Sequence, residues 1–207
     1  MAVKNPNILR REPSREIPKA WQEDIRRAVE VMRRGGVILY PTDTVWGLGC
    51  DATNAEAVAR VYAIKQRSDA KALITLVDSE ARVQLYVQRV PEVAWDLLDV
   101  ADKPLTIVFP GAKNLAPNLL AEDGSVGIRI TREPFSRELC FRMNKAVVST
   151  SANVSGMPAA TCFDAIDPTL LDSVDYVCTS RRGEKKPVRP SSVIRLGADG
   201  EIEILRA

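Results

Sequence analysis

Three polar clusters in this chain combine residue types that could bind anions. Residues 41–49 place two threonine hydroxyls and a carboxylate before two glycines, and Lys65 and Arg67 supply a pair of cations. Residues 149–156 form a run of hydroxyl and amide side chains that ends in glycine. Hydroxyls and amides donate and accept hydrogen bonds, while lysine and arginine bind phosphate and carboxylate groups. Together the clusters predict a site for a phosphate and a carboxylate.

Each cluster also has a simpler structural interpretation. Residues 41–49 could be a turn after a strand, and for this segment alone the two interpretations are about equal. Cations in a last helical turn, such as Lys65 and Arg67, ordinarily interact with the helix dipole. A loop such as 149–156 can bond its own backbone through its side chains. Only the combination of the three clusters favours a binding site over these alternatives.

The elements that would position the clusters alternate along the chain. Apolar runs with strand character predict strands at 37–40, 73–77, 105–109, 126–130, 146–149, 175–178, 192–196 and 202–205. Helical periodicity predicts helices near 19–34, 54–65, 79–87, 91–99 and 135–143, the first ended by a pair of glycines. Pro41 cannot continue a central strand, so the first strand should end before it. The pattern predicts an α/β fold, a twisted mixed open sheet with flanking helices.

Composition limits the remaining options. The chain has 207 residues, 45% of them hydrophobic, which is enough for one substantial core. We expect an N-terminal arm at 1–16 and one catalytic domain at 17–207. No apolar run approaches the roughly 20 residues of a membrane helix, and the polar N-terminus lacks a signal-peptide core, so we expect the cytoplasm. The chain contains no histidine, which excludes imidazole catalysis within it. Its four cysteines lack CxxC spacing, and we expect no metal cage.

The three clusters, in this order, resemble the YrdC-like threonylcarbamoyl-adenylate synthase family. The similar segments are 41–49, the Lys-x-Arg of Lys65 and Arg67, the Ser-x-Asn of Ser151 and Asn153, and the strand that carries Arg129. The similarity runs from about residue 20 to residue 206. The paired Lys-x-Arg and Ser-x-Asn motifs are specific in combination, although either one alone would be weak.

The resemblance implies a single YrdC-like domain and a nucleotidyltransferase reaction. ATP, L-threonine and bicarbonate or CO2 would give threonylcarbamoyl-adenylate and pyrophosphate, for threonylcarbamoyladenosine modification of tRNA. Positioning and electrostatic stabilisation can supply most of the catalysis, so no protein nucleophile is needed. Mg²⁺ would accompany ATP, bound mostly through phosphate oxygens. Expected partners are tRNA or double-stranded RNA and the transferase proteins of tRNA modification, but no membrane.

The resemblance also assigns roles to individual residues. Lys65 and Arg67 would be catalytic and would face the phosphates and the carbamate. ATP would be bound by Lys65, Ser149, Ser151, Asn153 and Arg206. Threonine would be bound by Thr42, Thr44, Arg67, Arg129 and Ser191.

Some positions depart from the family pattern, and other functions stay open. Arg181-Arg182-Gly183 stands where a glycine pair is common, and Pro190 replaces the acidic residue that often precedes Ser-Thr-Val. The basic run 181–189 could be a solvated surface or a contact for RNA or ATP phosphates. The main alternative function is a non-catalytic binder of double-stranded RNA or tRNA on the same fold. A further alternative is a carbamoyl-handling activity like that of the related domain in hydrogenase maturation.

Overall fold

One mixed sheet organises the part of the chain that the structure describes, residues 17–66, 73–185 and 190–207. In this computed structural model nine strands pair in the order β7-β1-β2-β6-β3-β5-β4-β8-β9 within those residues. Neighbouring strands are parallel in β1–β7, β3–β5 and β4–β8, and antiparallel in the other pairs. The strands are β1 (Ile38–Tyr40), β2 (Gly47–Gly49), β3 (Ile74–Val77), β4 (Leu105–Phe109), β5 (Val126–Ile130), β6 (Val147–Ser151), β7 (Tyr176–Val177), β8 (Ser192–Leu196) and β9 (Ile202–Arg206). The predicted α/β class and mixed open sheet are confirmed.

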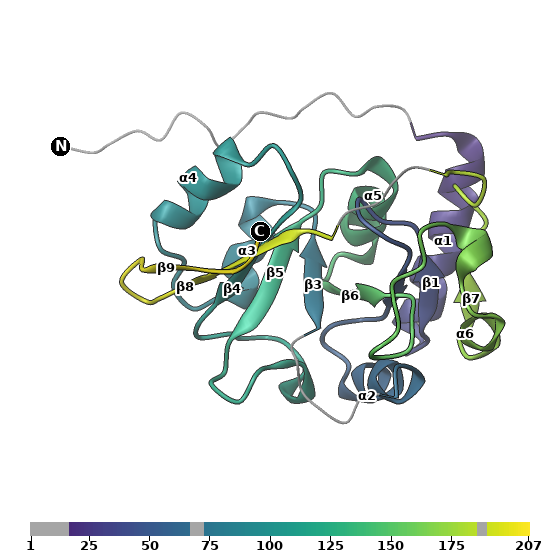
Figure 1. Ribbon diagram of the computed structural model, residues 1–207, viewed down its shortest axis with the longest axis horizontal. Helices are drawn as coiled ribbons and strands as arrows, with labels where there is room; N and C mark the ends of the chain where they lie inside the picture. Colours follow the sequence, from purple (N-terminus) through teal and green to yellow (C-terminus); the bar gives the residue numbers. More distant parts are fainter. Residues whose placement is uncertain (1–16, 67–72, 186–189) are drawn as a thin grey trace.

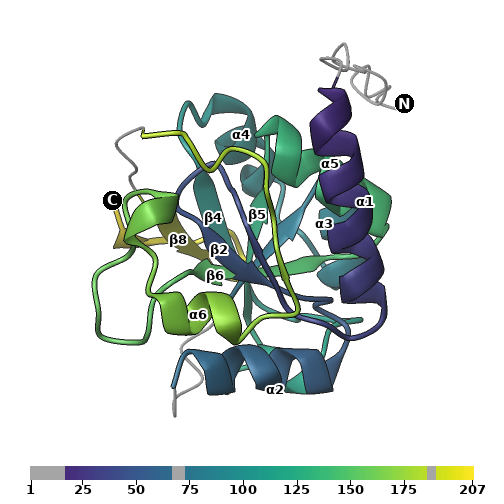
Figure 2. The same cartoon turned by 90° about the vertical axis from the view of Figure 1, so that its right-hand side faces the viewer.

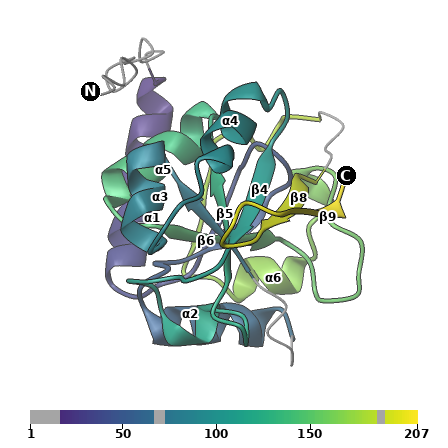
Figure 3. The ribbon, with the colours of Figure 1, turned by 90° about the vertical axis from the view of Figure 1, so that its left-hand side faces the viewer.

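Helices pack on this sheet as the periodicity predicts. They are α1 (Lys19–Arg33), α2 (Ala55–Ile64), α3 (Glu80–Tyr86), α4 (Val93–Val100), α5 (Pro134–Met143) and α6 (Pro168–Asp172), with short 3₁₀ turns at Pro117–Leu119 and Phe163–Ala165. Helices α1, α3 and α5 lie together on one side of the sheet, and α2 lies at one end of it (Figures 1, 2 and 3). The apolar stripe of α1 is buried, and Trp21 packs edge-on against Phe135 with ring centroids 5.9 Å apart. The two 3₁₀ turns and α6 were not predicted.

Helix ends are fixed by local chemistry that the sequence carries. Asn54 caps α2, because its side chain accepts hydrogen bonds from the amides of Glu56 and Ala57. Gly35 follows α1 with φ +82°, the left-handed conformation that glycine adopts without strain. Helix α2 ends at Ile64, so Lys65 is the first residue after the helix.

Strand β2 corrects the prediction that 41–49 is entirely a loop after β1. Gly47, Leu48 and Gly49 pair antiparallel with β1, and Gly47 and Leu48 also pair antiparallel with β6. A Cβ on Gly49 would lie 2.6 Å from the Tyr40 ring and 3.0 Å from the carbonyl oxygen of Val148. Because such distances are closer than real Cβ contacts, glycine here serves the packing of three strands.

Several predictions fall outside the described residues. The N-terminal arm at 1–16, the cation of Arg67 and part of the basic run at 186–189 are among them. Within the described residues, the longest apolar helices are too short or too polar to traverse a lipid bilayer.

Candidate functional site

The turn between β1 and β2 holds both predicted threonines in its own hydrogen bonds. Thr42 Oγ1 donates to the carbonyl of Val45 at 2.7 Å and accepts from the amide of Thr44 at 3.0 Å. The two threonine hydroxyls lie 3.1 Å apart, and both residues are buried. The threonines therefore shape this turn, which we call the 42–45 loop, and the residue between them projects away from it.

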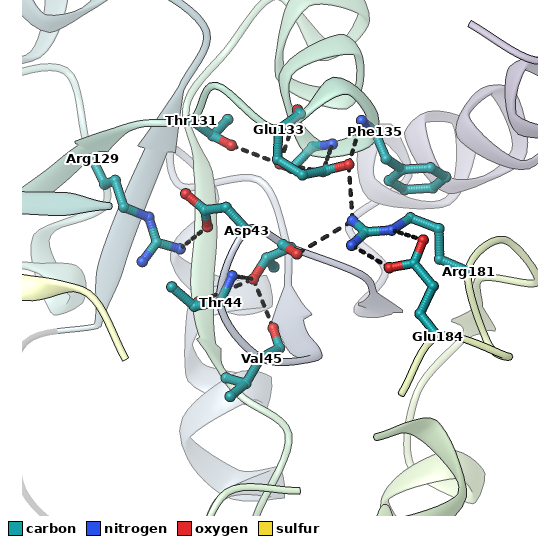
Figure 4. A network of polar contacts seen from close by, with 11 residues as sticks. Asp43, Thr44, Val45, Arg129, Thr131, Glu133, Phe135, Arg181 and Glu184 are labelled. Carbon is teal, nitrogen blue, oxygen red and sulfur yellow. Dashed lines mark hydrogen bonds and ion pairs between the residues drawn. The ribbon is translucent and has the colours of Figure 1, made fainter. Parts of the chain in front are cut away.

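That residue, Asp43, forms a buried ion pair with Arg129 of β5. Asp43 Oδ1 and Arg129 Nη2 lie 3.0 Å apart, and the side chains are only 11% and 4% exposed (Figure 4). The approach is not aligned as a hydrogen bond, so Asp43 Oδ1 and Arg129 Nε have no hydrogen-bond partner among the described residues. Burial raises the pKa of the Asp43 carboxyl, and the charge of Arg129 opposes that rise. The pair thus places a buried negative and a buried positive charge side by side, and each group has one polar atom without a hydrogen-bond partner among the described residues.

Lys65 reaches the loop that follows β6. Its Nζ donates to the carbonyl of Ser151 at 2.6 Å and to that of Asn153 at 2.8 Å, and the residue is 3% exposed. In return, the amide of Ser155 donates to the carbonyl of Lys65 at 3.0 Å. The Lys-x-Arg and Ser-x-Asn segments therefore meet, 86 residues apart in sequence. These contacts go well beyond the interaction of a helix-end cation with its own helix.

The predicted polar loop 149–156 begins within β6, because Ser149 and Ser151 belong to the strand and only the residues from position 152 on form the loop. Ser149 is buried, and its Oγ lies 3.4 Å from the position of a Cβ on Gly47, so the missing side chain leaves room for the hydroxyl. Asn153 turns its Nδ2 to the carbonyl of Met157 at 2.5 Å, which holds the loop in shape. Of the predicted ATP residues, Ser151 and Asn153 thus contact Lys65, while Ser149 lies on β6 next to Gly47.

Ser191 and Arg206 form a second group, at the start of β8 and the end of β9. Arg206 Nε donates to the carbonyl of Ser191 at 2.9 Å, and Ser191 Oγ lies 2.9 Å from Thr106 Oγ1. Burial lowers the pKa of Arg206, and the nearby charge of Arg129 lowers it further. The like charges of Arg129 and Arg206 therefore act on each other.

The first part of the basic run 181–189 is engaged inside the molecule. Arg181 Nη1 lies 2.8 Å from Glu133 Oε1, and Arg182 donates to the carbonyls of Val177 and Cys178. The Arg182 guanidinium also stacks over the Phe163 ring at 4.5 Å. A freely solvated surface, one of the two expectations for this run, is wrong for Arg181 and Arg182.

Three residues of this polar network were missing from the predicted site: Asp43, Glu133 and Arg181. Asp43 could have been found, because it stands between two predicted threonines. Glu133 carries a helix-start signal, since it precedes Pro134 and caps α5 by accepting from the amides of Phe135 and Ser136. Arg181 has no signal except that it replaces a glycine common in the resembled family.

The arrangement can bind anions and place them next to one another. Lys65 contacts the end of β6, Arg129 pairs with Asp43, and Arg206 contacts Ser191. Among the described residues no group of three or more cysteine, aspartate or glutamate side chains could hold a metal ion. A surface hollow of about 610 Å³ lies elsewhere, between α1 and α5, and contains none of these residues.

Comparison with known proteins identifies similar chains. Residues 30–207 match the family model Sua5_yciO_yrdC, whose description reads "Telomere recombination". A threonylcarbamoyl-AMP synthase of Vibrio cholerae serotype O1 is 38% identical over 187 residues, covering 86% of this chain and 100% of that protein.

Solved structures share the fold. E. coli YciO superposes with a TM-score of 0.78 at 27% identity, covering 89% of each chain. P. abyssi Sua5 complexed with L-threonine superposes with a TM-score of 0.75 at 25% identity, covering 86% of this chain. The matched region is 52% of that Sua5 chain, so this chain corresponds to about half of it.

Proposed function

The chain belongs to the Sua5/YciO/YrdC family, and from this premise we propose that it is a threonylcarbamoyl-AMP synthase. This enzyme would act as a nucleotidyltransferase on ATP, L-threonine and bicarbonate or CO2. Its product would pass to transferase proteins that modify an adenosine of tRNA. Because ATP and tRNA are its substrates or targets, we expect the reaction to run in the cytoplasm.

One observation carries the proposal: Lys65 is joined to the loop of Ser151 and Asn153 across 86 residues of sequence. A buried ammonium held by two backbone carbonyls and an amide oxygen is a preorganised positive centre, which stabilises anions more strongly than a solvated lysine would. The reaction needs such a centre, because a triphosphate and a carbamate must approach each other against their repulsion. Arg67, outside the described residues, is expected to act beside Lys65 on the phosphates and the carbamate.

Two groups of residues in the site are proposed to bind the two organic substrates, ATP and threonine. Ser149, Ser151, Asn153 and Arg206 are proposed to bind ATP. Threonine is a zwitterion, and the Arg129–Asp43 pair offers a cation for its carboxylate and an anion for its ammonium. Thr42 and Thr44 form the loop that carries Asp43, and Ser191 anchors Arg206.

The chemistry then follows from placement. The threonine ammonium gives up a proton to solvent, and its amine adds to CO2 with loss of a second proton to form a carbamate. A carbamate oxygen then forms a bond to the α-phosphorus while the bond to pyrophosphate breaks. The protein orients the reactants and neutralises their charges, which can supply most of the rate enhancement.

Mg²⁺ is proposed to arrive with the triphosphate. The donors in the described site are mainly hydroxyls, an amide and cations, which fits a metal held by phosphate oxygens rather than by a protein cage. When bound, the ion would neutralise charge on the departing pyrophosphate.

Omission of single substrates tests the proposal. Pyrophosphate release should require both L-threonine and bicarbonate, because the carbamate made from them is the attacking group. Serine should be a poorer substrate by about 10-fold or more, since one methyl group in a pocket is worth about 1–3 kcal/mol. A coupled pyrophosphate assay measures this, and equal release without threonine would contradict the assignment.

The alternative, a non-catalytic binder of double-stranded RNA or tRNA, is not favoured. Its main support is the basic run 181–189, and there Arg181 and Arg182 are engaged with Glu133 and with backbone carbonyls. Cations that are already paired and half-buried release few counterions on binding RNA, so they add little affinity.

A further inference from the structure

Arg181 occupies a backbone position that an arginine normally avoids. Its φ is +62°, in the left-handed region, which is strained for a residue that carries a Cβ. The turn before it is fixed by the buried carboxylate of Asp24 in α1, which accepts from the amide of Thr179 at 3.0 Å and from that of Ser180 at 2.7 Å. Glycine would be the residue of least strain here, so an arginine calls for a compensating contact.

The guanidinium of Arg181 makes that contact with three segments. Nη1 lies 2.8 Å from Glu133 Oε1 and donates to the Thr42 carbonyl at 3.3 Å, while Nη2 lies 2.8 Å from Glu184 (Figure 4). The Arg181 side chain is only 15% exposed. Glu133 is itself immobilised, because its carboxylate caps α5. Arg181 therefore ties the 42–45 loop to a rigid helix start.

The contact of Arg181 with the Thr42 carbonyl affects the two charged groups that are proposed to bind threonine. Thr42 directly precedes Asp43, whose carboxylate pairs with Arg129 at 3.0 Å. The charge of Arg181 also acts on Asp43, since together with Arg129 it opposes the rise that burial causes in the pKa of that carboxyl. Moving the Thr42 carbonyl would displace Asp43 and open or misalign the pair.

We propose that Arg181 is a positioning residue for the threonine half of the site: it holds the 42–45 loop through the Thr42 carbonyl and Glu133, so that Asp43 and Arg129 present their charges in a fixed geometry. The role toward threonine rests on the proposed function, whereas the contact of Arg181 with the 42–45 loop does not. Its effect should be selective, because the ATP residues beside Lys65 lie on other segments.

The variant Arg181→Gly separates this role from a merely structural one. Glycine relieves the left-handed backbone, so the melting temperature should change little while the guanidinium contacts disappear. The KM for threonine should rise between about tenfold and a hundredfold, as for a reactant misplaced by a fraction of an ångström, and the KM for ATP should stay within about twofold. Arg181→Lys should recover only part of the loss, because an ammonium lacks the guanidinium fork.

Two further variants complete the kinetic test. Glu133→Gln should raise the threonine KM in the same direction, and the double variant with Arg181→Gly should be no worse than the worse single variant, because both break one contact. Arg195→Gln, which removes an exposed arginine paired with Asp123 at 3.4 Å, should leave both KM values unchanged. Equal rises in both KM values for Arg181→Gly, or additive losses with Glu133→Gln, would overturn the proposal.

Hydrogen exchange tests the contact independently of catalysis. The Thr44 amide is bonded to Thr42 Oγ1, so in Arg181→Gly it should exchange faster than in the wild type, and in Arg195→Gln it should not. Unchanged exchange at residues 43–46 would overturn the positioning role whether or not the enzyme is active. If instead exchange rises but the wild type releases no threonine-dependent pyrophosphate, the proposed function fails and the positioning of the loop stands.

Discussion

The variant Lys65→Ala is expected to lose threonine-dependent pyrophosphate release by about 10²–10³-fold, the loss typical of removing one preorganised donor from an active site. The residue is 3% exposed, and its ammonium is held by the carbonyls of Ser151 and Asn153. Removing it deletes the positive centre and also releases the loop that is proposed to bind ATP. Steady-state assays with ATP, threonine and bicarbonate measure the effect.

The same contacts predict that Lys65→Ala loses more stability than removal of an ordinary helix-end cation would. A helix-end cation contributes only about 0.3–1 kcal/mol, but here carbonyl groups would lose a buried charged donor, which costs about 1–3 kcal/mol. Lys65→Ala should therefore lower the melting temperature measurably. Lys145→Ala is the matched control, because that lysine is 49% exposed and pairs with Asp51 at 2.7 Å. Activity of Lys65→Ala close to that of Lys145→Ala would remove Lys65 from the proposed site.

The second large effect is expected for Arg129→Met. Removing one partner of a buried ion pair leaves an uncompensated charge, which costs about 3–5 kcal/mol of unfolding free energy. Here the stranded group is Asp43, which lies 3.0 Å from Arg129 and is 11% exposed. Threonine-dependent activity should also be lost, because the proposed partner of the substrate carboxylate is gone. The additional change Asp43→Asn should restore much of the stability, but not the activity.

The pH dependence of that loss has a definite sign. Burial already raises the pKa of Asp43 above the ordinary value of 3.8, and Arg129 opposes the rise. A carboxyl whose folded-state pKa is raised stabilises the fold below its ordinary value, and that contribution is lost as the pH rises through the folded pKa. Without Arg129 the folded pKa rises further, so the stability deficit should be largest at neutral pH and should shrink toward pH 4 (roughly the unfolded value). A deficit that is constant with pH would contradict a stranded Asp43 carboxylate.

Three strands were predictable from the sequence to the residue. Leu105–Phe109, Val126–Ile130 and Ser192–Leu196 have the predicted bounds, because each mainly apolar segment is flanked by polar or turn-forming residues. Strand β2 was not predictable in this way. Its three residues include two glycines, which have low strand propensity, and it forms because β1 and β6 close on it from both sides.

The site was predictable where side chains cluster in sequence and not where they pair across the fold. Lys65 and the Ser151–Asn153 loop were named as separate clusters, and the structure brings them into contact. The Glu133–Arg181 pair joins the start of α5 to a turn near the C-terminal end of the sequence. Such pairs depend on how the strands are ordered in the sheet, and no local spacing records that order.

The most direct test of the central claim is to identify the product made from labelled bicarbonate. Wild-type protein incubated with ATP, Mg²⁺, L-threonine and ¹³C-bicarbonate should form threonylcarbamoyl-AMP that carries the label, as measured by mass spectrometry, and Lys65→Ala should form almost none. Consumption of ATP without a labelled threonine-containing adenylate would contradict the assignment of this site to threonylcarbamoyl-AMP synthesis.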